Sequence, residues 1–92
     1  MADVVLIVDD DESVSTMLRR IVCSNGIEAD IASSGEQALA LITQKNYALL
    51  LLDINMNGMD GFEVIQEIRL RGLTLPIIVV SGRREDYDAI YG

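Results

Sequence analysis

The chain has 92 residues, half of them hydrophobic, so it suits one small domain with a modest core and is not a disordered or low-complexity segment. Its 15 acidic residues against 7 basic ones give a net charge of -8, which disfavours direct binding to nucleic acid or to an anionic membrane surface. Cys23 is the only cysteine, and no apolar run approaches the length of a membrane span, so we expect a cytoplasmic protein without an internal disulfide.

The first predicted element is a strand at residues 4–8, VVLIV, whose consecutive apolar residues suit a strand covered on both faces. Asp9 and Asp10 follow it directly. A helical pattern then starts near residue 11 and stops at the Asn25-Gly26 pair, which favours a left-handed turn. The apolar face predicted for this helix comprises Val14, Met17, Leu18, Ile21 and Val22.

The same order of strand and helix repeats. Residues 27–33 alternate as an edge strand would, and Ser34 with Gln37 offers a capping box for a second helix. Residues 47–53, YALLLLD, then predict a central strand that runs through four leucines and ends at Asp53.

A polar loop leads into a third helix, which ends near Gly72. Its predicted apolar residues are Phe62, Val64, Ile65 and Ile68. Pro76 opens a fourth strand that ends at Ser81, and residues 83–92 start a further helix. The apolar side of that helix would comprise Tyr87, Ile90 and Tyr91.

Strands that alternate with helices predict an α/β fold with an open parallel sheet and helices on both faces. Ligands bind such sheets beyond the carboxyl ends of the strands. There the first strand brings Asp9 and Asp10, the third brings Asp53, and the fourth brings Ser81. We therefore expect three carboxylates and a hydroxyl to converge at one edge of the sheet.

Three carboxylates a few Å apart repel one another by roughly 4 kcal/mol per pair at an effective dielectric near 20. Either a pKa rises or a divalent cation binds, and oxygen ligands with few protein donors suit Mg²⁺. A carboxylate beside Mg²⁺ can act as a nucleophile toward a phosphoryl group. Asp53, alone on the middle strand, is the candidate nucleophile, with Ser81 placed to hold the phosphoryl oxygens.

Three segments, LIVDDDES, LLLLDINMNGMDGFEVIQEIR and LPIIVVSGR, together resemble the receiver domain of two-component response regulators. The resemblance covers essentially all of the chain as a single domain and implies a flavodoxin-like fold with strand order 2-1-3-4. It also implies a sensor histidine kinase as the partner that phosphorylates the domain.

The resemblance assigns a role to each candidate site residue. Asp53 would be the phosphoacceptor, and Ser81 would turn toward the phosphoryl group. The Mg²⁺ ligands would be Asp9, Asp10, Asp53 and the backbone carbonyl of Asn55, and the backbone N–H groups of Ile54 and Gly82 would contact the phosphoryl group.

The chain departs from the family pattern in two ways. Asn57 stands where the family commonly has proline, which we expect to matter little. The sequence also stops at Gly92, before the family's fifth strand, the lysine at the end of that strand and the fifth helix. Its only lysine, Lys45, is predicted far from the site, so the lysine that the family uses there is missing. We therefore expect poorly retained phosphorylation, and self-association through an exposed edge of strand 4 and through helix 4.

Other interpretations stay open. The run Asp9-Asp10-Asp11 can serve as a helix N-terminus, a role we expect for Asp11 itself, and Ser81 can be a simple helix cap. A truncated receiver that acts only as an assembly module is one alternative function. A Mg²⁺-dependent phosphatase with an aspartate nucleophile is another, although such enzymes place the nucleophile after the first strand rather than the third.

Overall fold

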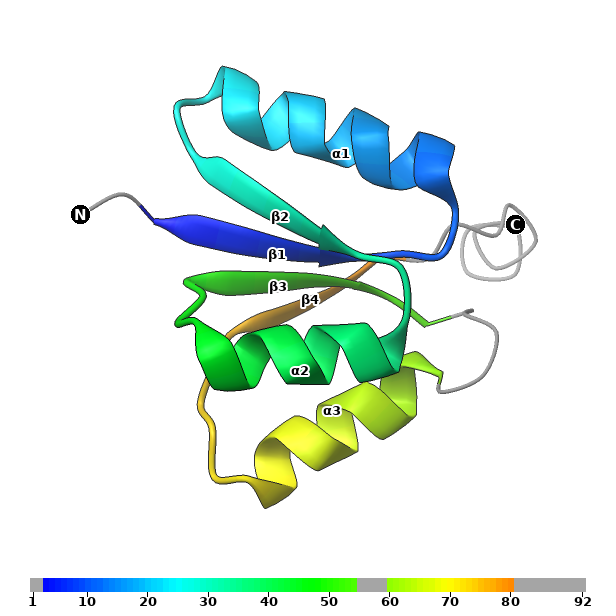
Figure 1. The fold of residues 1–92 in the computed structure, drawn as a ribbon, viewed down its shortest axis with the longest axis vertical. Helices are drawn as coiled ribbons and strands as arrows, with labels where there is room; N and C mark the ends of the chain where they lie inside the picture. Colours follow the sequence, from blue (N-terminus) through cyan, green and yellow to red (C-terminus); the bar gives the residue numbers. More distant parts are fainter. Residues whose placement is uncertain (1–2, 55–59, 81–92) are drawn as a thin grey trace, which may run out of the picture.

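A computed structural model describes residues 3–54 and 60–80, which form a four-stranded parallel sheet in the order β2-β1-β3-β4 (Figure 1). The elements are β1 Val4–Val8, α1 Glu12–Ser24, β2 Glu28–Ala32, α2 Gly35–Gln44, β3 Leu49–Asp53, α3 Gly61–Leu70 and β4 Ile77–Val80. The predicted α/β class and strand order are therefore confirmed.

The helices cover both faces of the sheet, with α1 on one side and α2 and α3 on the other (Figure 1). On the α2 and α3 side, alternate residues of the two central strands form the larger core, and all are fully or almost fully buried: Leu6, Val8, Leu50 and Leu52. On the α1 side, Val5 and Ile7 of β1 pack with Ala29 of β2. The two strands pair with each other along their length, and the side chains of β1 are buried on both faces, whereas Leu49 and Leu51 of β3 are only partly buried on the α1 side.

The buried face of α1 differs from the predicted one. Leu18 and Val22 pack against the core, whereas Met17 and Ile21 are 53% and 54% exposed. Ser15 is buried instead, and its hydroxyl donates a hydrogen bond to the carbonyl of Glu12 at 3.1 Å. The apolar stripe of α1 is thus wider than the strip of helix that touches the sheet, so the prediction was wrong for Met17 and Ile21.

The apolar side of α3 also needs correction. Val64 and Ile68 are fully buried, and Ile65 packs against the same core. Phe62, which the periodicity placed with them, is 64% exposed because it lies in the first turn of the helix, beside the buried Gly61 rather than on the core-facing side.

The ends of the helices follow the sequence closely. The Asp11 carboxylate caps α1 by accepting hydrogen bonds from the N–H groups of Ser13 and Val14, and Gly26 follows the helix with φ of +78°. At α2, Ser34 accepts from the N–H of Gln37, but the Gln37 side chain accepts from Ser33 rather than from the Ser34 backbone. The capping box is therefore half formed, and its second half is displaced by one residue.

Some predictions fall outside the described residues. These are the placements of Asn55, Ser81 and Gly82 and the helix expected at residues 83–92. In the part of the chain that the structure describes, no helix has both the length and the apolar character needed to cross a membrane.

Candidate functional site

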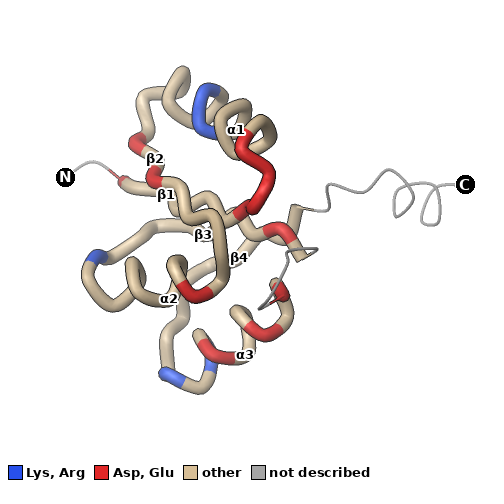
Figure 2. Tube along the Cα trace, turned by 45° about the vertical axis from the view of Figure 1, so that its right-hand side comes forward, with Lys and Arg blue, Asp and Glu red and all other residues tan. Residues whose placement is uncertain are grey.

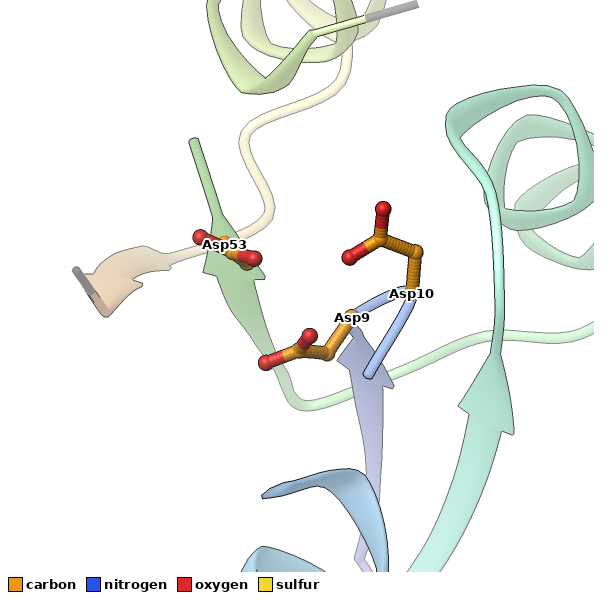
Figure 3. Close-up of side chains that lie close together, drawn as sticks. All are labelled: Asp9, Asp10 and Asp53. Atoms are coloured by element: carbon orange, nitrogen blue, oxygen red, sulfur yellow. The ribbon is translucent and has the colours of Figure 1, made fainter. Parts of the chain in front are cut away.

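Three carboxylates meet at the carboxyl edge of the sheet (Figure 3). Asp9 follows the last residue of β1, and Asp53 is the last residue of β3. The two strands are adjacent and parallel, with Val8 opposite Leu52, so their acidic ends lie side by side. Carboxylate oxygens of Asp9, Asp10 and Asp53 all lie within 4.8 Å of one another.

Burial makes this cluster electrostatically unfavourable without a counter-charge. Asp9 and Asp53 are only 4% and 7% exposed, whereas Asp10 is exposed to solvent. Burial raises the pKa of Asp9, and the negative charges of Asp53 and Asp10 raise it further. A backbone hydrogen bond from the N–H of Asp11, which lies 2.9 Å from Asp9 Oδ1, opposes that rise in the pKa.

The donor set fits a hard divalent cation. The three groups offer only carboxylate oxygens, close enough together to share one ion, and one of them faces solvent, where an ion keeps bound water. Acidic residues also gather along the segment that joins the end of β1 to the start of α1 (Figure 2). A bound cation would relieve the repulsion that raises the pKa of Asp9.

The backbone around Asp53 is held by two neighbouring strands and by the start of α3. Asp53 itself pairs with Val80 of β4, and the preceding Leu52 pairs with Val8 of β1. Beyond the strand, the N–H of Gly61 donates a hydrogen bond to the carbonyl of Ile54 at 3.1 Å and so closes the loop between β3 and α3. These contacts fix the backbone that carries the Asp53 carboxylate.

Lys45 is not at this site. It is the C-cap of α2, at the opposite end of the sheet, and its ammonium group lies 3.0 Å from Asp30 Oδ2. The sequence placed it away from the carboxylates, and the structure agrees.

One hydrogen-bond donor at the site was not predicted from the sequence, and three predicted site residues lie outside the described ranges. The sequence predicts that Asp11 caps the first helix, and the structure shows in addition that its backbone N–H donates a hydrogen bond to the Asp9 carboxylate. The sequence did contain a signal for this contact. The acidic run also caps a helix, so the chain must turn sharply there, which brings the N–H of one residue close to the side chain of another. The roles predicted for Asn55, Ser81 and Gly82 stay predictions, because these residues lie outside the described ranges.

Comparison with known proteins identifies the family. The model of the response regulator receiver domain matches residues 5–91. The transcriptional regulatory protein TctD of Salmonella typhimurium is 38% identical over 87 residues, which are 95% of this chain and 39% of TctD. The alkaline phosphatase synthesis transcriptional regulatory protein PhoP of Bacillus subtilis is 33% identical over 88 residues, covering 96% of this chain and 37% of PhoP. The chain thus spans less than two-fifths of these relatives.

Solved structures agree with this. A response regulator receiver protein from Pseudomonas putida superimposes with a TM-score of 0.82 at 35% identity, over 98% of this chain and 76% of that one. The response regulator TrrA from Thermotoga maritima, solved in complex with Mg(2+)-BeF, gives a TM-score of 0.84 at 34% identity, over 94% of this chain and 75% of TrrA. The chain belongs to the response regulator receiver domain family.

Proposed function

We propose that the chain is a phosphoacceptor signalling domain of a two-component system, in which Asp53 takes a phosphoryl group from a sensor histidine kinase with the help of Mg²⁺. The observation that carries this proposal is the convergence of Asp9, Asp10 and Asp53 within 4.8 Å at the ends of two central strands. Family membership and the Mg(2+)-BeF complex of TrrA support it.

In the proposed reaction, a carboxylate oxygen of Asp53 forms a bond to the phosphorus as the P–N bond of the donor phosphohistidine breaks. The imidazole nitrogen leaves with the bonding electron pair, and Asp53 becomes an acyl phosphate. Mg²⁺ at the site would neutralise charge on the phosphoryl oxygens during transfer. The protein would hold that ion through the carboxylates of Asp9, Asp10 and Asp53 and the backbone carbonyl of Asn55.

The remaining predicted residues would hold the transferred group. The hydroxyl of Ser81 and the backbone N–H groups of Ile54 and Gly82 would donate hydrogen bonds to the phosphoryl oxygens. The domain accepts one phosphoryl group and passes on a signal, so we propose a regulatory domain rather than a turnover enzyme. TctD and PhoP are named as transcriptional regulators, which supports a regulatory role.

Intact mass spectrometry tests the proposal directly. The wild-type chain, incubated with Mg²⁺ and a small acyl phosphate donor, should gain about 80 Da, the mass of one phosphoryl group. Asp53→Asn should gain nothing, and excess EDTA should abolish the gain in the wild type. An increase that persists in Asp53→Asn would refute Asp53 as the acceptor, and steady-state release of phosphate from a small phosphomonoester would favour the phosphatase alternative.

Exposed apolar side chains on β4 favour a second role, self-association. Within residues 3–54 and 60–80, β4 is an outer strand of the sheet, and its Ile78 and Val79 are 51% and 42% exposed. An apolar outer strand is a template for pairing with another chain. Size-exclusion chromatography with light scattering should show a mass above that of one chain that falls on dilution, and a monomer at high concentration would exclude this role.

A further inference from the structure

Gly61 lies so close to the phosphoacceptor strand that any side chain at this position would force the backbone to shift. It is the first residue of α3, and its N–H donates a hydrogen bond to the carbonyl of Ile54 at 3.1 Å. A Cβ atom at this position would lie 2.7 Å from the Cα of Ile54 and 2.9 Å from the carbonyl oxygen of Asp53. Favourable contacts between carbon atoms need about 3.5–4.0 Å, and both obstacles are backbone atoms that no side-chain rotation can move.

Neither side of this contact can give way without disturbing the fold. The end of β3 is held by its pairing with β1 and with β4. The helix is held by Val64 and Ile68, both fully buried, and by Asp60, whose carboxylate caps α3 by accepting from the N–H of Glu63 at 2.9 Å. A side chain at Gly61 must therefore push the Asp53 backbone and the first turn of α3 apart.

We infer that Gly61 is a positioning residue for the phosphoacceptor. The lack of a side chain lets the first turn of α3 close on the backbone of Asp53 and Ile54, and this closure keeps the Asp53 carboxylate at the distance from Asp9 and Asp10 that one cation requires. Site residues have to be held to within about 0.5 Å, which is less than the shift a Cβ atom would demand. The inference rests on the proposed function and adds a residue that determines the geometry of the phosphorylation site.

Gly61 differs in kind from two other glycines of the chain. Gly26 and Gly72 have φ of +78° and +76°, and a Cβ atom at either would have no neighbour within 4 Å. Alanine at Gly26 or Gly72 strains the backbone without touching the site, whereas alanine at Gly61 would suit the helix but collide with the strand. This difference supplies a matched control.

The test compares wild type, Gly61→Ala and Gly26→Ala. Mg²⁺ affinity is measured by isothermal titration calorimetry, and the rate of phosphoryl uptake at saturating Mg²⁺ is measured by intact mass. Gly61→Ala should bind Mg²⁺ about tenfold more weakly and take up phosphoryl about tenfold more slowly, the order of loss expected for misplacement by a fraction of an ångström. Gly26→Ala should melt at a lower temperature and keep both properties; wild-type values in Gly61→Ala would overturn the inference.

A second pair of variants applies if Gly61→Ala does not fold. Asp60→Ala and Asp60→Asn remove the same charge, but only the asparagine can still cap α3. Asp60→Ala should bind Mg²⁺ several-fold more weakly than Asp60→Asn because its first turn no longer closes on the strand, and equal affinities would overturn the inference. Failure of the wild type to take up phosphoryl would refute the proposed function alone, since the Mg²⁺ affinities still decide the role of Gly61.

Discussion

At the scale of single residues, Asp9 carries a cost that a metal ion should relieve. Its folded pKa is raised from 3.8, first by burial, so the protein loses stability as the pH rises above 3.8 and Asp9 gives up its proton. We predict that Asp9→Asn, which keeps the acceptor for the Asp11 N–H, melts higher than wild type at neutral pH in EDTA. The expected result is a higher melting temperature, because the variant removes the charge whose burial raises the pKa of Asp9.

The same variant should lose the response to Mg²⁺. Wild type should melt at a higher temperature when Mg²⁺ replaces EDTA, whereas the melting temperature of Asp9→Asn should rise little, because the variant lacks the charge of one ligand. Differential scanning calorimetry in the two buffers measures both effects. A variant that melts below wild type in EDTA would show that the Asp9 charge is already compensated in the metal-free protein.

Tyr47 is a second residue whose surroundings predict a measurable pH dependence. Its hydroxyl donates to Asp30 Oδ2 at 2.8 Å, and burial together with that bond and the Asp30 charge raises the pKa of Tyr47 from 10.0 to about 12. Between these two pH values, the unfolded chain releases the Tyr47 proton more readily than the folded chain does. The stability that Tyr47 contributes is therefore fully present below pH 10.0 and is lost as the pH rises toward about 12.

We predict that Tyr47→Phe is less stable than wild type by about 1 kcal/mol at neutral pH, the usual net value of a hydrogen bond. The gap should narrow as the pH rises from 10.0 to about 12, because wild type loses the stabilisation that the variant never had. Urea unfolding of both proteins across this range measures the gap, and a constant difference would contradict the assignment of the raised pKa to Tyr47.

At the scale of helices and strands, the sequence was sufficient to predict which elements form and in what order. It was not sufficient to predict which side chains each helix buries against the sheet. Four leucines followed by Asp53 could be recognised as a central strand because parallel topology places its end beside that of the first strand. The burial of Ser15 in place of Met17 could not be predicted, because periodicity gives the direction of an apolar stripe to no better than one residue. The approach of Gly61 to Asp53 was equally hidden, since spacing along the chain carries no distance across a loop.

The buried face of α1 can be tested by substitution. Leu18 packs against the core, so Leu18→Ala should lower the free energy of unfolding by about 2 kcal/mol. Met17 is 53% exposed, and Met17→Ala should change the free energy of unfolding by less than about 0.5 kcal/mol. Urea denaturation measures the free energy of unfolding of both variants, provided that their m-values are equal. Equal decreases in the two variants would support the buried face predicted from periodicity, which includes Met17.

At the scale of the whole molecule, Mg²⁺ has two ways to stabilise a chain with a net charge of -8: general screening of that charge, and binding at the carboxylate cluster. Only binding is saturable and depends on named residues, and it should add about 2.7 kcal/mol at a Mg²⁺ concentration of 100 times the dissociation constant. We therefore predict that the melting temperature rises further with MgCl₂ than with NaCl at matched ionic strength. The excess should vanish in Asp10→Asn, which keeps the size of the side chain and removes one ligand charge. Equal rises with the two salts would mean that the acidic surface as a whole, rather than the three carboxylates at the strand ends, accounts for the effect of the cation.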